Sequence, residues 1–173
     1  MKENNDNYKK IGIILGSDSD FPHIEKGVLL FKEFGIPFEI EVSSAHRTPE
    51  RTVEVIKNFE AQGIRVIIAA AGGAAHLPGV IAAHTLLPVL GVPIPSDLSG
   101  LDSLYSIVQM PGGIPVAAFG IGSAGGLNSV LFAIEILALD DADLRKKMIE
   151  FREKQKKGVL EKSMRLKEKI KTL

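Results

Sequence analysis

At residues 66–71 the chain reads VIIAAA, six apolar residues with no polar residue among them. An uninterrupted apolar run of this kind predicts a strand buried on both faces, as in a parallel sheet covered by helices on two sides. Similar runs predict four more strands, at residues 11–15, 38–42, 88–92 and 115–119. The sequence therefore predicts an α/β protein built on a five-stranded parallel sheet.

Amphipathic helical segments separate these predicted strands. Residues 22–34 place Ile24, Val28 and Phe31 on one helical face, and residues 50–62 show the same spacing of apolar side chains. Strands that alternate with helices form right-handed βαβ units, which cover both faces of a sheet. We expect the common flavodoxin-like order 2-1-3-4-5 in a three-layer sandwich, with ligands bound where the loops after strands 1 and 3 meet.

The length of the chain, 173 residues, fits a single domain with a substantial core. We expect one domain over residues 1–173, with a core at about residues 10–139 and a helical extension at about residues 140–171. In the extension Leu144 and Met148 begin an apolar stripe that predicts one long C-terminal helix. Packing between subunits and cover for the core are both open as the purpose of this stripe.

The composition is that of an ordinary globular protein, with 45% hydrophobic and 24% charged residues. No apolar run approaches the roughly 18 residues that a membrane span needs. The polar N-terminus, MKENNDNYKK, lacks the apolar segment of a signal peptide. The chain contains no cysteine, which excludes disulfides and thiolate metal sites. These features predict a cytoplasmic protein without a membrane partner.

Charge is unevenly distributed, although the formal net charge is zero. Residues 141–173 are rich in lysine and arginine, whereas the rest of the chain is acidic. A basic helical tail without interleaved aromatic side chains is typical of a solvated helix, so we expect no nucleic-acid partner. A phosphate site in the acidic body must depend on local donors such as backbone N–H groups.

The loop after the first predicted strand reads GSDSD, from Gly16 to Asp20. Small and hydroxyl-bearing residues between a strand and a helix can turn backbone N–H groups and hydroxyls toward a phosphate. Ser17 and its neighbours are equally typical of a helix N-cap. Asp20 favours a ligand site, because a carboxylate just past a phosphate loop can accept hydrogen bonds from ribose hydroxyls.

The loop after the second predicted strand, residues 43–49, contains His46 and Arg47. Pro49 suits the first turn of the next helix and Thr48 suits its N-cap, so the backbone should be fixed there. Arginine offers a planar fork to a phosphate, and histidine is the side chain best suited to proton transfer near neutral pH. The pair predicts a phosphate binder beside an acid–base group, and a purely structural histidine is the alternative.

The loop after the third predicted strand reads GGAAHLPG, residues 72–79. Gly72, Gly73 and Ala74 carry almost no side-chain bulk before His76. A planar ligand could lie against this bare backbone, and a tight turn would explain the glycines equally well.

Other motifs narrow the class of site. The segment GIGSAG at 120–125 matches GxGxxG but follows the last predicted strand, so a dinucleotide site is not expected there. The sequence contains no Walker A lysine motif, no GxSxG elbow and no HExxH motif. His23 and His84 have no partner at ligand spacing, so we interpret both as ordinary histidines and expect no metal.

Four segments together resemble motifs of the N5-carboxyaminoimidazole ribonucleotide mutase family: residues 16–20, 44–49, 72–79 and 104–111. The resemblance covers about residues 10–165. It implies the flavodoxin-like fold and a catalytic domain that works without a cofactor. The implied activity is that of an isomerase of de novo purine (IMP) biosynthesis, which moves a carboxyl group from nitrogen to the ring carbon of an aminoimidazole ribonucleotide.

The resemblance also implies roles for individual residues. His46 matches the family's catalytic histidine, and Asp20 matches the residue that holds the ribose. The residues implied to hold the phosphate are Ser17, Ser44 and Arg47. Those implied to hold the imidazole and its carboxylate are Ser19 and the backbone of Gly72, Gly73, Ala74 and His76. The family resemblance further implies a homo-octamer, with residues 110–113 and the C-terminal helix at subunit contacts.

Two features depart from the family pattern. Residues 93–100 are one residue shorter than is usual, and His84 stands where lysine or another residue often occurs. Both lie away from His46 in the sequence. Two other functions remain open: a related carboxylase that uses free carbon dioxide, and a non-catalytic nucleotide-binding module. Carboxylase relatives typically have lysine after the histidine and a bulkier Gly-Arg-Ser-Asn type loop, and this chain has neither.

Overall fold

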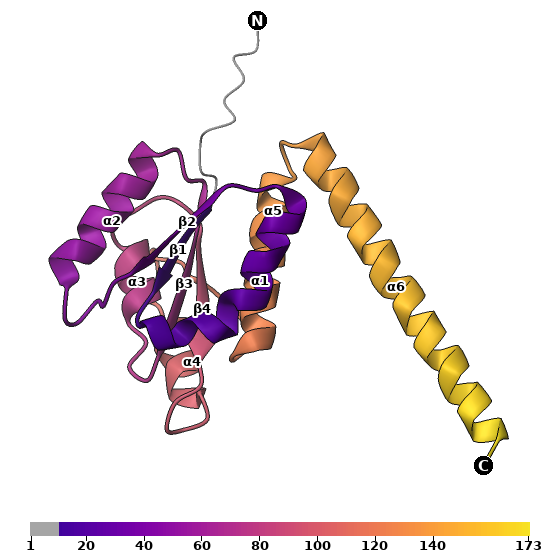
Figure 1. Cartoon of the computed structure of the whole chain (residues 1–173). Helices are drawn as coiled ribbons and strands as arrows, with labels where there is room; N and C mark the ends of the chain where they lie inside the picture. Colours follow the sequence, from indigo (N-terminus) through magenta and orange to yellow (C-terminus); the bar gives the residue numbers. More distant parts are fainter. Residues whose placement is uncertain (1–10) are drawn as a thin grey trace, which may run out of the picture. The chain divides into compact units, whose positions relative to one another are not determined.

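The computed structural model describes residues 11–173 (Figure 1). Contacts within the chain divide it into two units, one that ends at Ala133 and one that spans Ile134–Leu173. The polar N-terminus, on which the expectation of no signal peptide rests, lies outside the described residues. The expected division between a core and an extension at about residue 139 stays a prediction.

The first unit contains a five-stranded sheet in which all strand pairs are parallel. The strands are β1 (Ile11–Leu15), β2 (Phe38–Val42), β3 (Val66–Gly72), β4 (Val89–Ile94) and β5 (Ala117–Ala118). Their order is β2-β1-β3-β4-β5, which confirms the predicted flavodoxin-like order. The point where the strand order reverses lies between β1 and β3, and the loops that follow these strands meet there.

Helices follow the strands and cover both faces of the sheet. They are η1 (Asp18–Asp20), α1 (Phe21–Phe34), α2 (Pro49–Ala61), α3 (Leu77–Ala82), α4 (Leu101–Val108) and α5 (Ser123–Leu137), the last belonging to this unit up to Ala133. Figure 1 shows α2 and α3 on one face and α1 with α5 on the other, so the predicted three-layer sandwich is confirmed.

Prolines and a glycine set the ends of these helices. Pro22, Pro49 and Pro78 lie in the first turns of α1, α2 and α3, where the missing N–H group costs no helical hydrogen bond. Gly35 ends α1 in the left-handed conformation, with φ at 72°. The helix limits therefore fall within one residue of the predicted 22–34 and 50–62.

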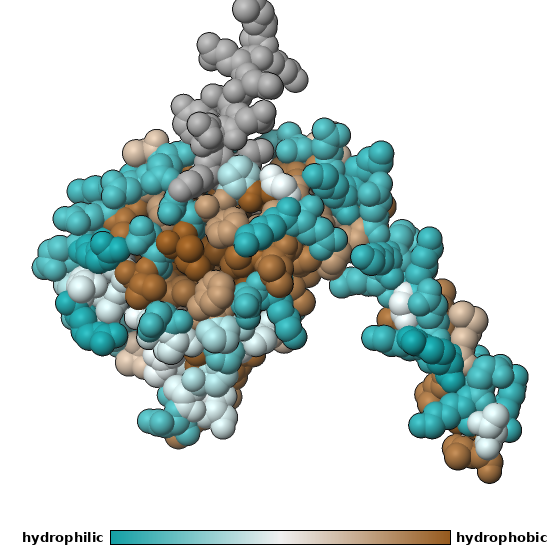
Figure 2. All heavy atoms as spheres, in the orientation of Figure 1, coloured by the Kyte–Doolittle hydropathy of each residue, from teal (hydrophilic) through white to brown (hydrophobic). Residues whose placement is uncertain are grey.

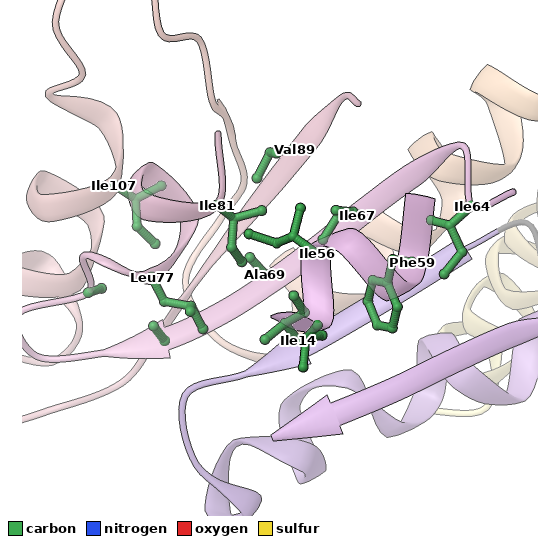
Figure 3. Close-up of a cluster of buried hydrophobic side chains, with 13 residues drawn as sticks. Ile14, Ile56, Phe59, Ile64, Ile67, Ala69, Leu77, Ile81, Val89 and Ile107 are labelled. Carbon is green, nitrogen blue, oxygen red and sulfur yellow. The ribbon is translucent and has the colours of Figure 1, made fainter. Parts of the chain in front are cut away.

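The central strands are buried as their apolar runs predicted. β1 and β4 are buried throughout, and β3 is buried up to Gly72. On the side of α2 and α3, a hydrophobic cluster forms around Ile56, Phe59 and Ile67 (Figure 3). Phe59 lies so close to β1 that a Cβ atom on Gly12 would overlap its ring. A glycine in the middle of a strand thus admits the large side chain of the helix above it.

The two outer strands differ from the prediction. β2 is only partly buried because Glu39 and Glu41 interrupt its apolar residues, so the expectation of a strand buried on both faces is wrong for it. β5 pairs with β4 through Ala117 and Ala118 alone, instead of through all of residues 115–119. Because an outer strand pairs along one edge only and lies at the border of the sheet, it needs less apolar surface than a central strand.

The GxGxxG segment has a packing role. A Cβ atom on Gly125 would overlap the carbonyl oxygen of Gly120, and one on Gly126 would overlap the carbonyl oxygen of His23. The second contact joins the start of α5 to the start of α1. On the same helix pair, a Cβ atom on Gly27 would lie 2.5 Å from Val130. Gly126 and Gly27, which lie outside the GxGxxG segment, thus let the two helices approach closely, and within the segment Gly125 lets the backbone turn closely against Gly120.

The second unit consists largely of α6 (Ala142–Lys171), which confirms the predicted long C-terminal helix. The Asp141 carboxylate caps it by accepting a hydrogen bond from the Leu144 N–H group at 3.0 Å. Apolar side chains in its C-terminal half are exposed, namely Val159, Leu160, Met164, Leu166 and Ile170. Figure 2 shows charged and apolar residues interspersed along this helix. Packing of the stripe between subunits stays a prediction.

None of the helices within residues 11–173 is long and apolar enough to cross a membrane.

Candidate active site

Three loops meet at the carboxyl ends of β1, β2 and β3 and enclose a cavity of about 360 Å³. Its lining residues are Gly16, Ser17, Asp20, Ser44, Ala45, His46, Arg47, Ala71, Gly72, Ala74, His76 and Leu77. This is the place that the strand order predicts for a ligand. Among the residues that the family resemblance implies for the site, Ser19 and Gly73 do not line the cavity.

The first loop is organised around Ser17 and Asp20. The Asp20 carboxylate accepts a hydrogen bond from the Ser17 N–H group at 3.0 Å, and the two residues form a capping box for η1. The capping interpretation of this loop is therefore correct, and both residues face the cavity as well. Asp20 is only 7% exposed, and this burial raises the pKa of its carboxyl above the ordinary value.

Ser19 lies on the outer side of the same loop. Its hydroxyl donates a hydrogen bond to the Ser17 hydroxyl oxygen at 2.8 Å, and its side chain is exposed. Ser19 thus reaches the cavity only through Ser17. Its predicted contact with the imidazole and carboxylate stays a prediction.

The second loop is closed by Thr48. The Thr48 hydroxyl oxygen accepts the Ser44 N–H group at 3.1 Å and donates to the Ser44 carbonyl at 3.1 Å. Thr48 occupies the predicted N-cap position of α2, although its side chain makes no capping hydrogen bond. The hydroxyl serves the loop instead of the helix. The loop that carries His46 and Arg47 is consequently a fixed turn.

Ser44 and Arg47 leave polar hydrogens available at the cavity. The Ser44 hydroxyl oxygen accepts the Arg47 N–H group at 3.2 Å, and its own proton has no acceptor within the described part of the chain. The Arg47 guanidinium likewise forms no ion pair with any residue of 11–173. Donors of this kind suit an anionic group.

The third loop turns at Gly73, whose φ is +63°. Its carbonyl oxygen accepts the Ala75 N–H group at 2.8 Å, and the Ala74 carbonyl accepts the His76 N–H group at 2.7 Å. The tight turn suggested by the glycines is present, and Gly72 and Ala74 still present bare backbone to the cavity. Gly73 itself is turned away, and its N–H group donates to the Ser103 hydroxyl at 2.9 Å.

The second and third loops bring two histidines together. His46 Nε2 lies 2.8 Å from His76 Nδ1, and the rings meet edge to face with centroids 4.9 Å apart. Since one nitrogen must donate and the other accept, these two atoms share a single proton. Two doubly protonated rings would set one N–H group against the other. The contact couples the two rings at one edge of the cavity.

Sequence reasoning missed this pairing and missed Ser103. The histidines follow β2 and β3, which flank β1 on opposite sides, and this shared neighbour is the signal that could have placed them together. Ser103 lies within α4 and has no such signal.

The other two described histidines do not line this cavity, although His84 lines a neighbouring pocket together with His76. His23 Nδ1 is 3.4 Å from the Ser123 hydroxyl and His84 Nδ1 is 2.8 Å from the Val80 carbonyl oxygen. Within residues 11–173, no three His, Asp or Glu side chains come together as a metal site would require.

A parallel α/β sheet with a histidine pair, serine hydroxyls and an arginine at its switch point is typical of an enzyme that acts on a small phosphorylated substrate. The comparison with protein families is more specific. The family model described as "AIR carboxylase" matches residues 10–158, and the chain belongs to this family.

Several relatives share about half of their sequence with this chain. The protein named "N5-carboxyaminoimidazole ribonucleotide mutase" of Thermotoga maritima is 52% identical over 158 residues, 91% of each chain. The proteins of the same name in Bacillus subtilis and Escherichia coli are 52% and 49% identical, over 90% of this chain and 97% and 92% of their own. The predicted family resemblance is confirmed.

Among solved structures, Treponema denticola PurE is similar, with a TM-score of 0.81 and 31% identity. The match covers 90% of this chain and 97% of that one. It agrees with the fold described above.

Proposed function

We propose that this protein is an N5-carboxyaminoimidazole ribonucleotide mutase of purine biosynthesis. The observation that carries the proposal is the contact of His46 with His76 inside a cavity whose other walls hold hydroxyls, a carboxylate and an arginine. Identity of about 50% to proteins of that name, over nine-tenths of the chain, supports the same reaction.

Each part of such a substrate has its own group of residues in the cavity. The phosphate lies against Ser17, Ser44 and Arg47, which offer hydroxyl and guanidinium donors. The ribose lies against Asp20, whose carboxylate accepts from its hydroxyls. The imidazole and its carboxylate lie over the Gly72–His76 backbone, with Ser19 as a further contact at this end.

His46 carries the proton in both halves of the reaction. It donates to the carbamate nitrogen, the nitrogen–carbon bond breaks, and carbon dioxide is released within the cavity. The electron-rich ring carbon then attacks the carbon dioxide, and His46 takes the proton that this carbon loses. The substrate gains one proton from His46 and returns one to it, so the product is an isomer of the substrate. No electrophilic cofactor is required. His76 holds His46 in position by sharing the proton between the rings.

The enzyme acts in the cytoplasm as a homo-oligomer, an octamer by family resemblance. Residues 110–113 and the exposed apolar side chains of α6 would lie at its subunit contacts.

A carboxylase that uses free carbon dioxide is the second candidate, because the matching family model is described as AIR carboxylase. Two features of the chain favour the mutase. Arg47, not lysine, follows His46, and the residues after Gly73 are alanines. The small loop leaves space for the exocyclic carbamate, whereas an arginine side chain there would fill it and change its charge.

The test is a comparison of substrates with the purified protein. Initial rates of formation of the carbon-carboxylated ribonucleotide are measured from the preformed carbamate, and separately from aminoimidazole ribonucleotide with low bicarbonate. The mutase should use the carbamate efficiently. Use of the free amine at low bicarbonate, with little use of the carbamate, would assign the protein as the carboxylase.

A further inference from the structure

A buried serine joins the ends of two strands behind the cavity. Ser103, in the first half of α4, is fully buried and does not line the cavity. Its hydroxyl donates to the carbonyl oxygen of Ile94, at the end of β4, at 2.8 Å. The same oxygen accepts the N–H group of Gly73, just past β3, at 2.9 Å. One hydroxyl therefore serves as the link between α4 and both strand ends.

The direction of these bonds is determined. A serine hydroxyl has one proton, and a carbonyl can only accept, so the Ser103 proton points at Ile94. The Gly73 N–H group must then be the donor to Ser103. The nearby Ser96 hydroxyl commits its proton to the Asp102 carboxylate, with both O–O distances 2.6 Å. That bond lowers the pKa of Asp102 and anchors the start of α4.

The Gly73 peptide is the first link of a short chain of contacts to the histidine pair. Its carbonyl accepts the Ala75 N–H group at 2.8 Å, and the next carbonyl, of Ala74, accepts the His76 N–H group at 2.7 Å. His76 then meets His46 at 2.8 Å. Because Gly73 has φ of +63° and open space around its Cβ position, no side-chain packing of its own holds this turn.

We propose that Ser103 is a positioning residue, which fixes the Gly73 turn and through it the His76 ring against His46. Loss of the hydroxyl would leave the Gly73 N–H group and the Ile94 carbonyl without their buried partner. The turn would relax, and the distance between the two histidines would vary. The substrate contacts of the other two loops would be untouched. The catalytic consequence of this inference rests on the proposed function.

Ser103→Ala is the test, and Ser129→Ala is its matched control. Ser129 is also fully buried in a helix, and its hydroxyl donates to the Gly126 carbonyl oxygen at 2.8 Å, away from the cavity. Ser103→Ala should lower kcat at least about tenfold, shift the pH profile of kcat, and leave KM within about threefold. Ser129→Ala should leave the pH profile in place. Equal loss of kcat in both variants, with the same pH profile, would overturn the inference.

Two further measurements cover the remaining outcomes. Ser103→Cys puts a somewhat larger thiol in the place of the hydroxyl and forms a weaker hydrogen bond, so it should give an intermediate kcat even where Ser103→Ala does not fold; wild-type kcat in the folded variant counts against the role. Imidazole ¹⁵N shifts of the ligand-free protein, which has 4 histidines, need no activity. Shifts of His46 and His76 should change in Ser103→Ala only. If wild type and Ser129→Ala do not consume the carbamate, the proposed function fails. Unchanged ¹⁵N shifts of His46 and His76 in Ser103→Ala would refute the positioning role separately.

Discussion

His46 is the side chain through which the proposed reaction must move its proton, because it lines the cavity and touches His76 at 2.8 Å. His46→Asn should lower kcat by at least about 100-fold while ligand binding stays within about tenfold, because an amide fills similar space but cannot cycle a proton. Initial rates with the carbamate and calorimetry with the product measure the two quantities.

The control for this substitution is His84→Asn. His84 Nδ1 lies 2.8 Å from the Val80 carbonyl oxygen and the residue does not line the cavity, so its variant should keep the wild-type rate. A His46→Asn variant that retains a tenth or more of the wild-type rate would show that another group transfers the proton.

Asp20 should make stability depend on pH. Burial raises the pKa of its carboxyl above the ordinary value of 3.8, so the protonated form is more favoured in the folded protein than in the unfolded chain. The stability that this group contributes is complete below its ordinary pKa and is lost as the pH rises through the raised value. Asp20→Asn keeps an oxygen for the Ser17 N–H group and has no charge to bury. The variant should therefore gain stability relative to wild type as the pH rises above 3.8 and through the raised value.

Urea unfolding of both proteins across this pH range measures the difference. Asp97→Asn, at an exposed position outside the cavity, removes a carboxylate in the same way and is the matched control. A difference between wild type and Asp20→Asn that stays constant with pH would contradict the expectation.

At the scale of single residues, the sequence predicted the side chains that follow the strands but not those that support them. Ser17 follows the first strand, and His46 and Arg47 lie in the loop after the second strand, so the rule that ligands gather at the carboxyl ends of the strands near the switch point was sufficient to place them. Ser103 acts from a helix that follows another strand. Its contact with Gly73 depends on the packing of α4 on the sheet, which no local pattern encodes.

The loops after β1 and β2 act together, because the strands that carry them are neighbours in the sheet. Arg47→Ala should weaken binding of the product ribonucleotide by about 10- to 100-fold, the value of a charge-assisted hydrogen bond. Binding of the matching ribonucleoside, which lacks the phosphate, should change little. Calorimetry with both ligands gives the comparison. Arg51 pairs with Glu41, so the control variant Arg51→Ala should leave both affinities unchanged.

Equal losses of affinity for the two ligands would mean that Arg47 does not hold the phosphate.

Close packing of α1 on α5 depends on Gly126. A Cβ atom there would overlap the carbonyl oxygen of His23, and backbone atoms cannot rotate away as a side chain can. Gly126→Ala should therefore lower the free energy of unfolding by about 1–3 kcal/mol. Gly158→Ala, in α6 with open space at the Cβ position, should instead be neutral or raise it by up to about 1 kcal/mol. Thermal unfolding of both variants measures the contrast, and similar midpoints would show that the helices can separate without cost.

The limits of the elements show what apolar patterning can predict. Strands in the centre of the sheet need apolar residues on both faces, so β1 and β3 were located to within a residue. β5 was predicted too long, because the apolar residues around it also serve packing outside the strand. Its length is set by the two pairs that it forms with β4, at Ala117 and Ala118.

At the scale of the whole chain, strand order was predictable because few topologies satisfy right-handed crossovers between parallel strands. The reaction was not predictable from periodicity, since one fold carries many activities. It entered through four short segments whose order and content match one family, and the family model covers residues 10–158. The purpose of the exposed apolar side chains of α6 was not predictable, because a single chain does not contain what would cover them.

The outer strands have a consequence for how copies of this protein can meet. An unpaired strand edge is a template for a strand of another molecule, and such pairing leads to fibrous aggregates. β2 carries Glu39 and Glu41, with Arg51 paired to the latter, and β5 offers only two residues. Charge at one edge and brevity at the other discourage continuation of the sheet from one molecule into the next. The sheet of one molecule therefore does not extend into the next, and contacts between neighbouring molecules are left to surfaces other than the strand edges.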